Sequence, residues 1–234
     1  MSTVTIAQLK EKLHYLSQVD KKRKIHGADW FVNEQQHGHE YKSYPVSEVE
    51  LLQLEQTFGI QLPQDYRNFL LHIGWGAGPG YRLLNPKELV SYTRHFSNDP
   101  DRWFGDEYLN EETGYGELTY FRELTSEHIA IFRNKLLTEK PSVLSHIAPV
   151  ILSIEGAIVI NKNGGGYCHA LVVEGELRGT IWNIAGGNSI SSIPQGMVTQ
   201  KGDNTFEYPT RPFTFFQWIE NWLDESIKEA IRKY

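Results

Sequence analysis

The side chains most able to bind a metal ion or attack a substrate are nine scattered histidines and one cysteine. Their densest group is HGHE, in which His37 and His39 would share one face of a strand and could bind a metal with a third ligand. No second group has matching spacing, because Cys168 and His169 are adjacent. We therefore expect loop histidines and no metal site.

The sequence shows no catalytic constellation. Cys168 falls in an expected strand beside a glycine turn, which favours a buried, inert thiol over a nucleophile in an electropositive, partly exposed setting. There is no H-E-x-x-H helix and no G-x-S-x-G elbow. We expect a non-enzymatic protein without a cofactor. Loss of an activity on changing His37, His39 or Cys168 would instead reveal an enzyme.

Glycines occupy every second position from 74 to 80 in IGWGAGPGYRLL, as in loops that cradle phosphates. A phosphate loop follows a strand and precedes a helix, because the anion binds at the helix N-terminus. Here the glycines follow an expected helix, no Lys-Ser/Thr pair comes after them, and Pro79 lacks an N–H donor. The pattern predicts a helix end and a turn, beside which Trp75 or Tyr81 could be exposed.

Residues 97–127 combine acidic and aromatic side chains. Nine acids and two arginines give this segment a net charge of −7, against −6 for the whole chain. Two interpretations remain open: a solvated loop whose aromatic residues cover the core, or a docking face for a basic partner. In the second, acids would steer the partner and aromatic residues would anchor it.

The docking interpretation selects eight candidate partner-binding residues. They are Asp101, Trp103, Asp106, Glu107, Glu111 and Glu112 in the acidic segment, with Trp75 and Tyr81 at the glycine turn. The pI near 5.9 argues against direct nucleic-acid binding and fits a basic protein partner.

Local patterns predict the helices that position these segments. Thr5, Ser47 and Thr214 each have Glu or Gln three positions later, the spacing of a capping box that starts a helix. A further helix is expected from Pro63, whose missing N–H suits a first turn, and a short one around Glu127.

The helix expected after Ser47 has several apolar residues close together in the sequence. We expect Val49 and Leu52 on its apolar face, with Leu51 and Leu54 on the flank. Gly59 should end it in the left-handed conformation.

The second half of the chain is richer in strand patterns. APVILSI, AIVI, HALVV and GTIWNI are β-branched or alternating runs, and NKNGGG (161–166) and EGEL separate them as turns. HALVVEGELRGTIWNI predicts an antiparallel hairpin.

Composition indicates a soluble cytoplasmic protein without a membrane anchor. The N-terminal residues lack the apolar run of a signal peptide, no long apolar stretch occurs, and one cysteine excludes an internal disulfide. We expect an N-terminal helix and basic linker over residues 1–25, where KKRK could be a solvated helix end or a contact for an acidic group. Residues 26–234 would form the domain, with an insertion at about 90–146.

Three segments, in order, resemble the SUKH superfamily of fungal Smi/Knr-type cell-wall assembly regulators and many bacterial proteins. They are VSEVELLQLEQTFGIQLPQDYRNFLLHIGWGAGPGYRLLNPKEL, CHALVVEGELRGTIWNI and TFFQWIENWLD. LPxxYxxFL alone is moderately specific, but its occurrence in order with the other two strengthens the resemblance. The similarity covers most of residues 45–89 and 147–224, extends more loosely over 26–44, and does not cover 90–146.

The resemblance implies an α+β fold with a single, mostly antiparallel sheet backed by helices. It also implies a non-enzymatic, protein-binding role. Bacterial members are linked to polymorphic toxin systems as immunity proteins that block a cognate toxin, often a nuclease or deaminase. Fungal members act as regulatory scaffolds, which is the alternative. The oligomeric state stays open.

Overall fold

The computed structural model describes residues 4–29, 31–32, 35–36, 38–91, 156–164, 167–185, 191–196, 199–200, 206–207 and 211–233. The expected strand APVILSI, the expected helix around Glu127 and all but the beginning of the insertion lie outside the described residues.

The capping pairs start the helices that they predict. Thr5 and Ser47 form complete capping boxes at the starts of α1 (Ile6–Val19) and α2 (Glu48–Phe58). At the start of α8 (Phe215–Lys233), the Thr214 N–H donates to Gln217 Oε1 at 2.9 Å. Gly59 ends α2 with a φ of 68°, as expected for a left-handed cap.

The apolar face of α2 differs from the expected one. Leu51 and Leu54 are buried, whereas Val49 is 63% and Leu52 50% exposed. The stripe through Leu51 and Leu54 continues to Phe58, which packs against the core, whereas the stripe through Val49 and Leu52 continues to a glutamine. The longer apolar stripe therefore determines which face of α2 meets the core.

Pro63 directly precedes α3 (Gln64–His72) as its N-cap residue rather than lying inside the first turn. The expected apolar face is confirmed, because Tyr66, Phe69 and Leu70 are buried. Tyr66 and Phe69 both contact the ring of Phe215 edge-on, at centroid distances of 4.8 and 5.1 Å. These rings join α3 to the first turn of α8.

The main sheet is an antiparallel meander of seven strands in the order β3-β4-β5-β6-β7-β8-β9. The strands are β3 (Ser43–Tyr44), β4 (Trp75–Gly76), β5 (Arg82–Leu83), β6 (Ala157–Gly164), β7 (Tyr167–Val172), β8 (Ile181–Ala185) and β9 (Ser191–Pro194). Two short antiparallel pairs stand apart, β1 (Phe31–Val32) with β2 (Gln35–Gln36) and β10 (Thr199–Gln200) with β11 (Phe206–Glu207). The predicted α+β class and mostly antiparallel sheet are confirmed.

The predicted hairpin is also confirmed, since β7 pairs with β8 in antiparallel register from Tyr167↔Ala185 to Leu171↔Ile181. The turn expected at 161–166 is wrong for residues 161–164, which belong to β6. The β6–β7 ladder shifts register between Val159 and Asn161 and again between Lys162 and Gly164. Irregular pairing thus extends the strand through a sequence whose Asn and Gly residues are typical of turns.

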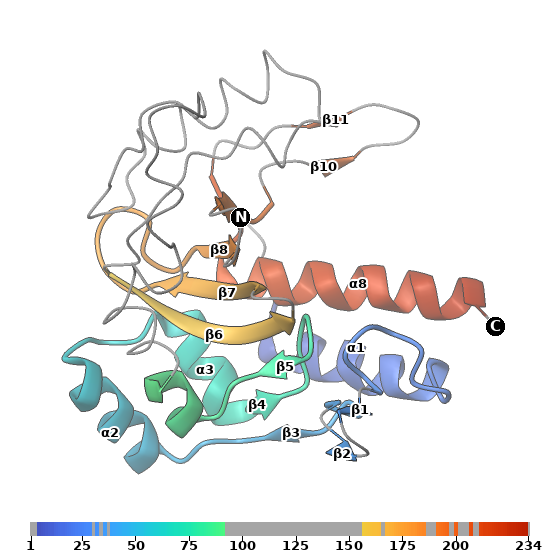
Figure 1. Cartoon of the computed structure of the whole chain (residues 1–234), viewed down its shortest axis with the longest axis horizontal. Helices are drawn as coiled ribbons and strands as arrows, with labels where there is room; N and C mark the ends of the chain where they lie inside the picture. The colour runs from blue at the N-terminus through green and yellow to red at the C-terminus, as the bar shows by residue number, and fades with distance from the viewer. Residues whose placement is uncertain are drawn as a thin grey trace.

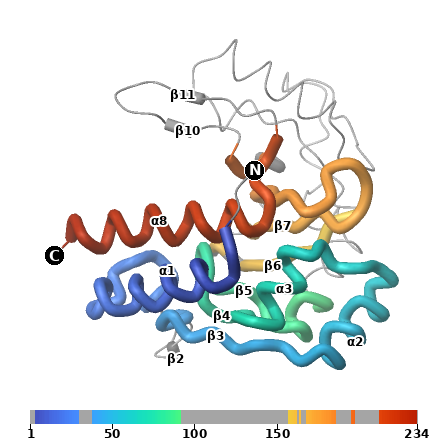
Figure 2. Tube along the Cα trace, turned by 180° about the vertical axis from the view of Figure 1, so that it is seen from behind, coloured from blue at the N-terminus to red at the C-terminus, as the bar shows by residue number. Residues whose placement is uncertain are grey.

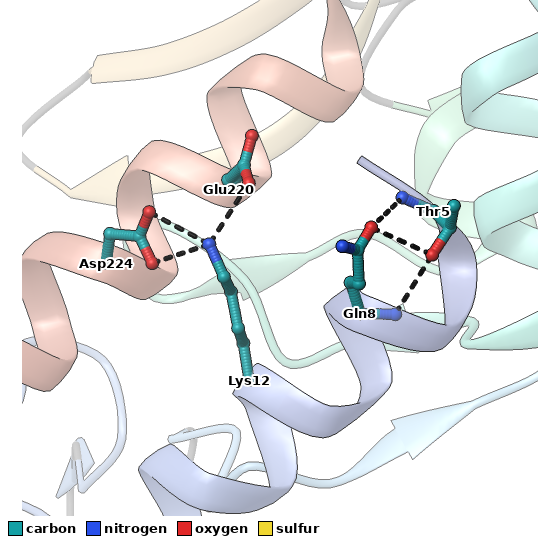
Figure 3. A network of polar contacts seen from close by, with 5 residues as sticks. All are labelled: Thr5, Gln8, Lys12, Glu220 and Asp224. Atoms are coloured by element: carbon teal, nitrogen blue, oxygen red, sulfur yellow. Dashed lines mark hydrogen bonds and ion pairs between the residues drawn. The ribbon is translucent and has the colours of Figure 1, made fainter. Parts of the chain in front are cut away.

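The first and last helices lie side by side in both views of the chain (Figure 1, Figure 2). Leu9 and Leu16 of α1 belong to the same buried cluster as Leu223 and Ala230 of α8. Across this contact, Lys12 Nζ lies 3.0 Å from Glu220 and 2.7 Å from Asp224 (Figure 3). The division into residues 1–25 and 26–234 stays a prediction, although α1 packs into the common core.

None of the helices in the described ranges combines the length and the apolar character that crossing a lipid bilayer demands.

Candidate functional site

The glycine-rich turn brings separate backbone segments into direct contact. Gly74 follows α3 with a φ of 107°, and a Cβ there would lie 2.0 Å from the Tyr44 carbonyl oxygen. At Gly27, which has a φ of 84°, a Cβ would lie 1.8 Å from the Gly80 carbonyl oxygen. Glycine accepts both the left-handed conformation and the close approach. The predicted helix end is confirmed, and the turn is confined to residues 77–80 because Trp75 and Gly76 form β4. The turn packs directly on the segment around Gly27.

Asn161 connects this turn to the sheet. Its side chain is fully buried, and Nδ2 donates to the Pro79 carbonyl oxygen at 2.6 Å. Its Oδ1 accepts the backbone N–H of His169, its cross-strand partner, at 2.9 Å. A carbonyl can only accept and a backbone N–H can only donate, so these two contacts fix the orientation of the amide.

That orientation determines the tautomer of His169. Its Nδ1 lies 2.8 Å from Asn161 Oδ1, which is an acceptor, so Nδ1 must carry the proton and donate it. Burial lowers the pKa of His169 to about 4, which leaves the ring neutral at pH 7. The other ring nitrogen, Nε2, consequently carries a lone pair, and it has no hydrogen bond within the described part of the chain.

Two tryptophans of α8 stand beside buried histidines. The Trp218 ring lies 4.8 Å from the His169 ring, and the Trp222 ring lies 5.9 Å from the His39 ring at 87°. His39 Nδ1 accepts the Tyr41 N–H at 3.0 Å. Burial, with a smaller contribution from nearby His26, lowers the pKa of His39 to about 4, although Asp20 acts in the opposite direction. At pH 7, neutral rings therefore contact both tryptophans.

His169, Trp218 and Trp222 line a cavity of about 350 Å³. One wall is formed by α8. The remaining lining comes from Ile25 and His26, the turn at Pro79 and Gly80, and polar residues of the sheet region that include His169. The α8 wall comprises Trp218, Asn221, Trp222, Glu225, Ser226 and Glu229. The volume is within the range of roughly 300–1,000 Å³ typical of small-ligand sites.

The cavity lining is rich in acceptors and negative in charge. Glu225 and Glu229 are the carboxylates among its described lining residues, and that lining includes no lysine or arginine. Asn163, Gln195 and Asn221 contribute amides. Chemically, the arrangement fits a ligand that is cationic, donates hydrogen bonds and has a surface able to pack on indole rings.

Two of the predicted partner-binding residues lie in the described part of the chain. The Tyr81 ring is 5.2 Å from the His26 ring, which places Tyr81 at the edge of the cavity. Trp75 is half-buried on β4 and stacks on Tyr44 at 4.5 Å, so the two are not brought together in one site. The other six candidates, Asp101, Trp103, Asp106, Glu107, Glu111 and Glu112, lie outside the described residues.

Sequence reasoning missed Asn161, His169 and the cavity side of α8. Asn161 lies in NKNGGG, whose composition favours a turn, and aromatic residues at helical spacing, such as the tryptophans of α8, favour a core position. Trp218 is indeed buried, while Trp222 is half-buried. A polar residue opposite a histidine in an otherwise apolar hairpin is the signal that could have located the site.

The structure also shows where the cysteine and one of the two clustered histidines lie. Cys168 is buried as predicted, and burial raises the pKa of its thiol to about 12, which disfavours the reactive thiolate. His39 lies in the loop between β2 and β3, as expected, and is buried, whereas His37 lies outside the described residues. Within the described ranges, no group of three or more His, Cys, Asp or Glu side chains is arranged to hold a metal ion.

An antiparallel sheet that packs with helices around one core defines an α+β domain. The profile of the SMI1 / KNR4 family (SUKH-1) matches residues 45–208. The chain therefore belongs to this family, and the resemblance seen in the sequence is confirmed. The family is generally non-enzymatic, and its protein-binding members support a protein partner for this chain. No curated protein and no solved structure matches the chain.

The range matched by the family profile, residues 45–208, leaves out both terminal helices, α1 and α8. It covers residues 90–146, which the resemblance seen in the sequence left out, and it ends before TFFQWIENWLD, which that resemblance included. The helix that forms one wall of the cavity is thus beyond the range matched by the family profile.

Proposed function

We propose that this chain is a cytoplasmic immunity protein that neutralises a cognate toxin by direct binding, without a catalytic step. Membership of the SMI1 / KNR4 family (SUKH-1) is the observation that carries the proposal. Bacterial SUKH proteins are linked to toxin systems in this role. The toxin class that we infer is a nuclease or deaminase.

The charge of the chain supports this class of toxin. A toxin domain that acts on nucleic acid requires a basic surface, and this chain carries a net charge of −6 with a local −7 in residues 97–127. Acidic side chains can occupy the positions of phosphates and increase the association rate. The eight candidate partner-binding residues remain our proposed contacts, with the acidic segment as the docking face.

The proposal is tested by capture of the partner. The tagged full-length chain serves as bait in lysate of its native host, the bound proteins are eluted with rising salt, and each fraction is identified by mass spectrometry. We expect one dominant partner with a basic, toxin-like domain, bound one-to-one and released at high salt. Purified partner should then lose its nuclease or deaminase activity when the chain is added in equal amount.

A regulatory scaffold of the Smi/Knr type is the second candidate, because the family takes its description from those proteins. A scaffold should collect several cellular partners weakly, and none of them should be inhibited stoichiometrically. Recovery of such a set, without a toxin-like protein, would contradict the immunity proposal and favour the scaffold.

A further inference from the structure

We propose that the cavity between α8, the glycine-rich turn and the β6–β7 hairpin binds the guanidinium group of an arginine side chain from the protein partner. The inference rests on the proposed function in one respect: that the guanidinium belongs to a protein partner. That the cavity binds a guanidinium is argued separately, from the acceptors, aromatic rings and charge of its lining residues.

The first argument is the set of hydrogen-bond acceptors. Asn161 holds the Nδ1–H of His169, which leaves the Nε2 lone pair of a cavity-lining ring as an acceptor. The carboxylates of Glu225 and Glu229 add further acceptors from α8. A guanidinium has five N–H donors and no acceptor, and its planar donors match carboxylates in a bidentate geometry.

The second argument is the aromatic wall. Trp218 and Trp222 are one helical turn apart on α8 and both line the cavity. Indole is the most favourable aromatic surface for a cation, and the planar guanidinium stacks on it more readily than a lysine ammonium does. Trp218 contacts His169 and Trp222 contacts His39, so both indoles are held by further rings.

The third argument is charge. Among the described residues, the carboxylates of Glu225 and Glu229 form ion pairs with lysines on their own helix, Glu225 with Lys228 at 2.8 Å and Glu229 with Lys233. All four of these side chains are 46–63% exposed, and exposed ion pairs contribute little to stability. An arginine that also packs on the tryptophans can therefore displace the lysines from the carboxylates.

The volume of the cavity fits a single arginine side chain. A cavity of about 350 Å³ is small for a folded element and sufficient for one long side chain. Arginine is enriched among the residues that dominate binding energy at protein interfaces. The cavity would thus anchor one arginine of a basic partner.

The test uses Nα-acetyl-arginine methylamide as the probe and the full-length chain labelled with ¹⁵N at its indole nitrogens. The signals of Trp218 and Trp222 are assigned with Trp218→Phe and Trp222→Phe variants. We expect both signals to shift saturably, with a Kd on the order of 1–10 mM. The neutral isostere Nα-acetyl-citrulline methylamide should bind at least about tenfold more weakly. Absence of saturation, or equal binding of both probes, would overturn the inference.

A double variant, Glu225→Gln with Glu229→Gln, tests the role of charge. It should raise the Kd of the arginine probe roughly fivefold to tenfold. The matched control, Glu174→Gln with Glu176→Gln, removes two exposed acids from the turn after β7 and should leave that Kd unchanged. Equal effects of the two double variants would overturn the assignment of Glu225 and Glu229.

Partner capture distinguishes a protein arginine from a free guanidinium compound. If the double variant at Glu225 and Glu229 binds the captured partner less tightly than the control does, the source is the partner. If the probe binds but partner affinity is unaffected, the source is a small molecule and our assignment to the partner is overturned. A negative probe titration with intact partner capture removes this inference and leaves the proposed function standing.

Discussion

Asn161 Oδ1 and His169 Nδ1 lie 2.8 Å apart across the β6–β7 ladder, and this contact sets the tautomer of the histidine. The amide is held from its other end by the Pro79 carbonyl oxygen. The turn after α3 therefore influences, through one side chain, which nitrogen of His169 can accept a hydrogen bond.

Replacing Asn161 should destabilise the fold. Asn161→Ala leaves the Pro79 carbonyl and the His169 backbone N–H without their buried partner, which we expect to lower the free energy of unfolding by roughly 2–4 kcal/mol. Urea unfolding measures the loss. Asn163→Ala, two positions along the same strand at a half-buried site, is the control and should lose less than about 1 kcal/mol. Similar losses in both variants would contradict the bridging role of Asn161.

The two buried histidines should make stability depend on pH. Folding lowers the pKa of His39 and of His169 from 6.5 to about 4, so below pH 6.5 the unfolded chain binds more protons than the folded chain. The stabilisation is complete above pH 6.5 and is lost as the pH falls toward 4, by up to roughly 3 kcal/mol per histidine.

Urea unfolding at several pH values between 7.5 and 4 checks this dependence. His169→Gln should reduce the fall in unfolding free energy between pH 6.5 and 4, because one of the two shifted groups is removed. His72→Gln, at an exposed position of α3, should leave the fall unchanged. A pH profile that is the same in both variants would exclude His169 as a source of the dependence.

The contact between Gly27 and Gly80 should be intolerant of a methyl group. Gly27→Ala places a Cβ 1.8 Å from the Gly80 carbonyl oxygen and should force the turn to move, with a loss of more than about 2 kcal/mol. Gly59 also has a positive φ, but a Cβ there meets nothing within 4 Å. Gly59→Ala should therefore cost only the backbone strain of about 1–2 kcal/mol. Thermal unfolding compares the two variants, and a smaller loss at Gly27 would argue against the close contact.

The ion pairs of Lys12 should contribute modestly to the packing of α1 on α8. Burial lowers the pKa of Lys12, but hydrogen bonds to Asp224 and Glu220 outweigh it and raise the pKa overall. The groups are 27–42% exposed, so Lys12→Gln should lower the unfolding free energy by only about 0.5–1 kcal/mol. Lys10→Gln, exposed on the same helix, should be neutral in the same chemical unfolding experiment. A neutral Lys12→Gln would show that the apolar contacts alone hold these helices together.

Charge reversal should reveal whether the acidic segment is the docking face. We expect lysine substitutions at Asp106, Glu107, Glu111 and Glu112 to slow association with the captured partner by roughly tenfold or more at low salt. Stopped-flow or surface plasmon resonance measures the rate, and circular dichroism verifies the fold.

A matched reversal elsewhere provides the control for total charge. Glu11, Asp29, Glu174 and Glu176 are exposed acids of the described part of the chain. Lysine at these four positions changes the net charge equally and should slow association less. Unchanged binding after reversal of the acidic segment, with the fold intact, would exclude that segment as the docking face.

Several elements were predictable because their causes are local. The capping boxes at Thr5 and Ser47 depend on contacts three residues apart, and Gly59 caps α2 within one turn. The hairpin of β7 and β8 follows from two strand patterns joined by a short turn. The order of these elements also carried the resemblance to the family that the chain belongs to.

Local patterns were insufficient where the sequence was compatible with two alternative structures. In α2, two apolar stripes were available, and contact with the core selected the one through Leu51 and Leu54. At 161–164, turn-forming residues continue a strand because β5 and β7 pair with it on both sides. Tertiary pairing outweighed local propensity in both places.

By itself, the sequence determined the helix starts, the hairpin, the buried Cys168, the acidic charge and the family resemblance, since each depends on residue type or short-range spacing. Only the tertiary structure decided that α1 packs on α8, that Asn161 orients His169, and that Trp218 and Trp222 border a cavity with Glu225 and Glu229. The cavity lining extends from Ile25 to Glu229, and no local spacing rule relates residues so far apart in the chain. Packing of a common core brings them together.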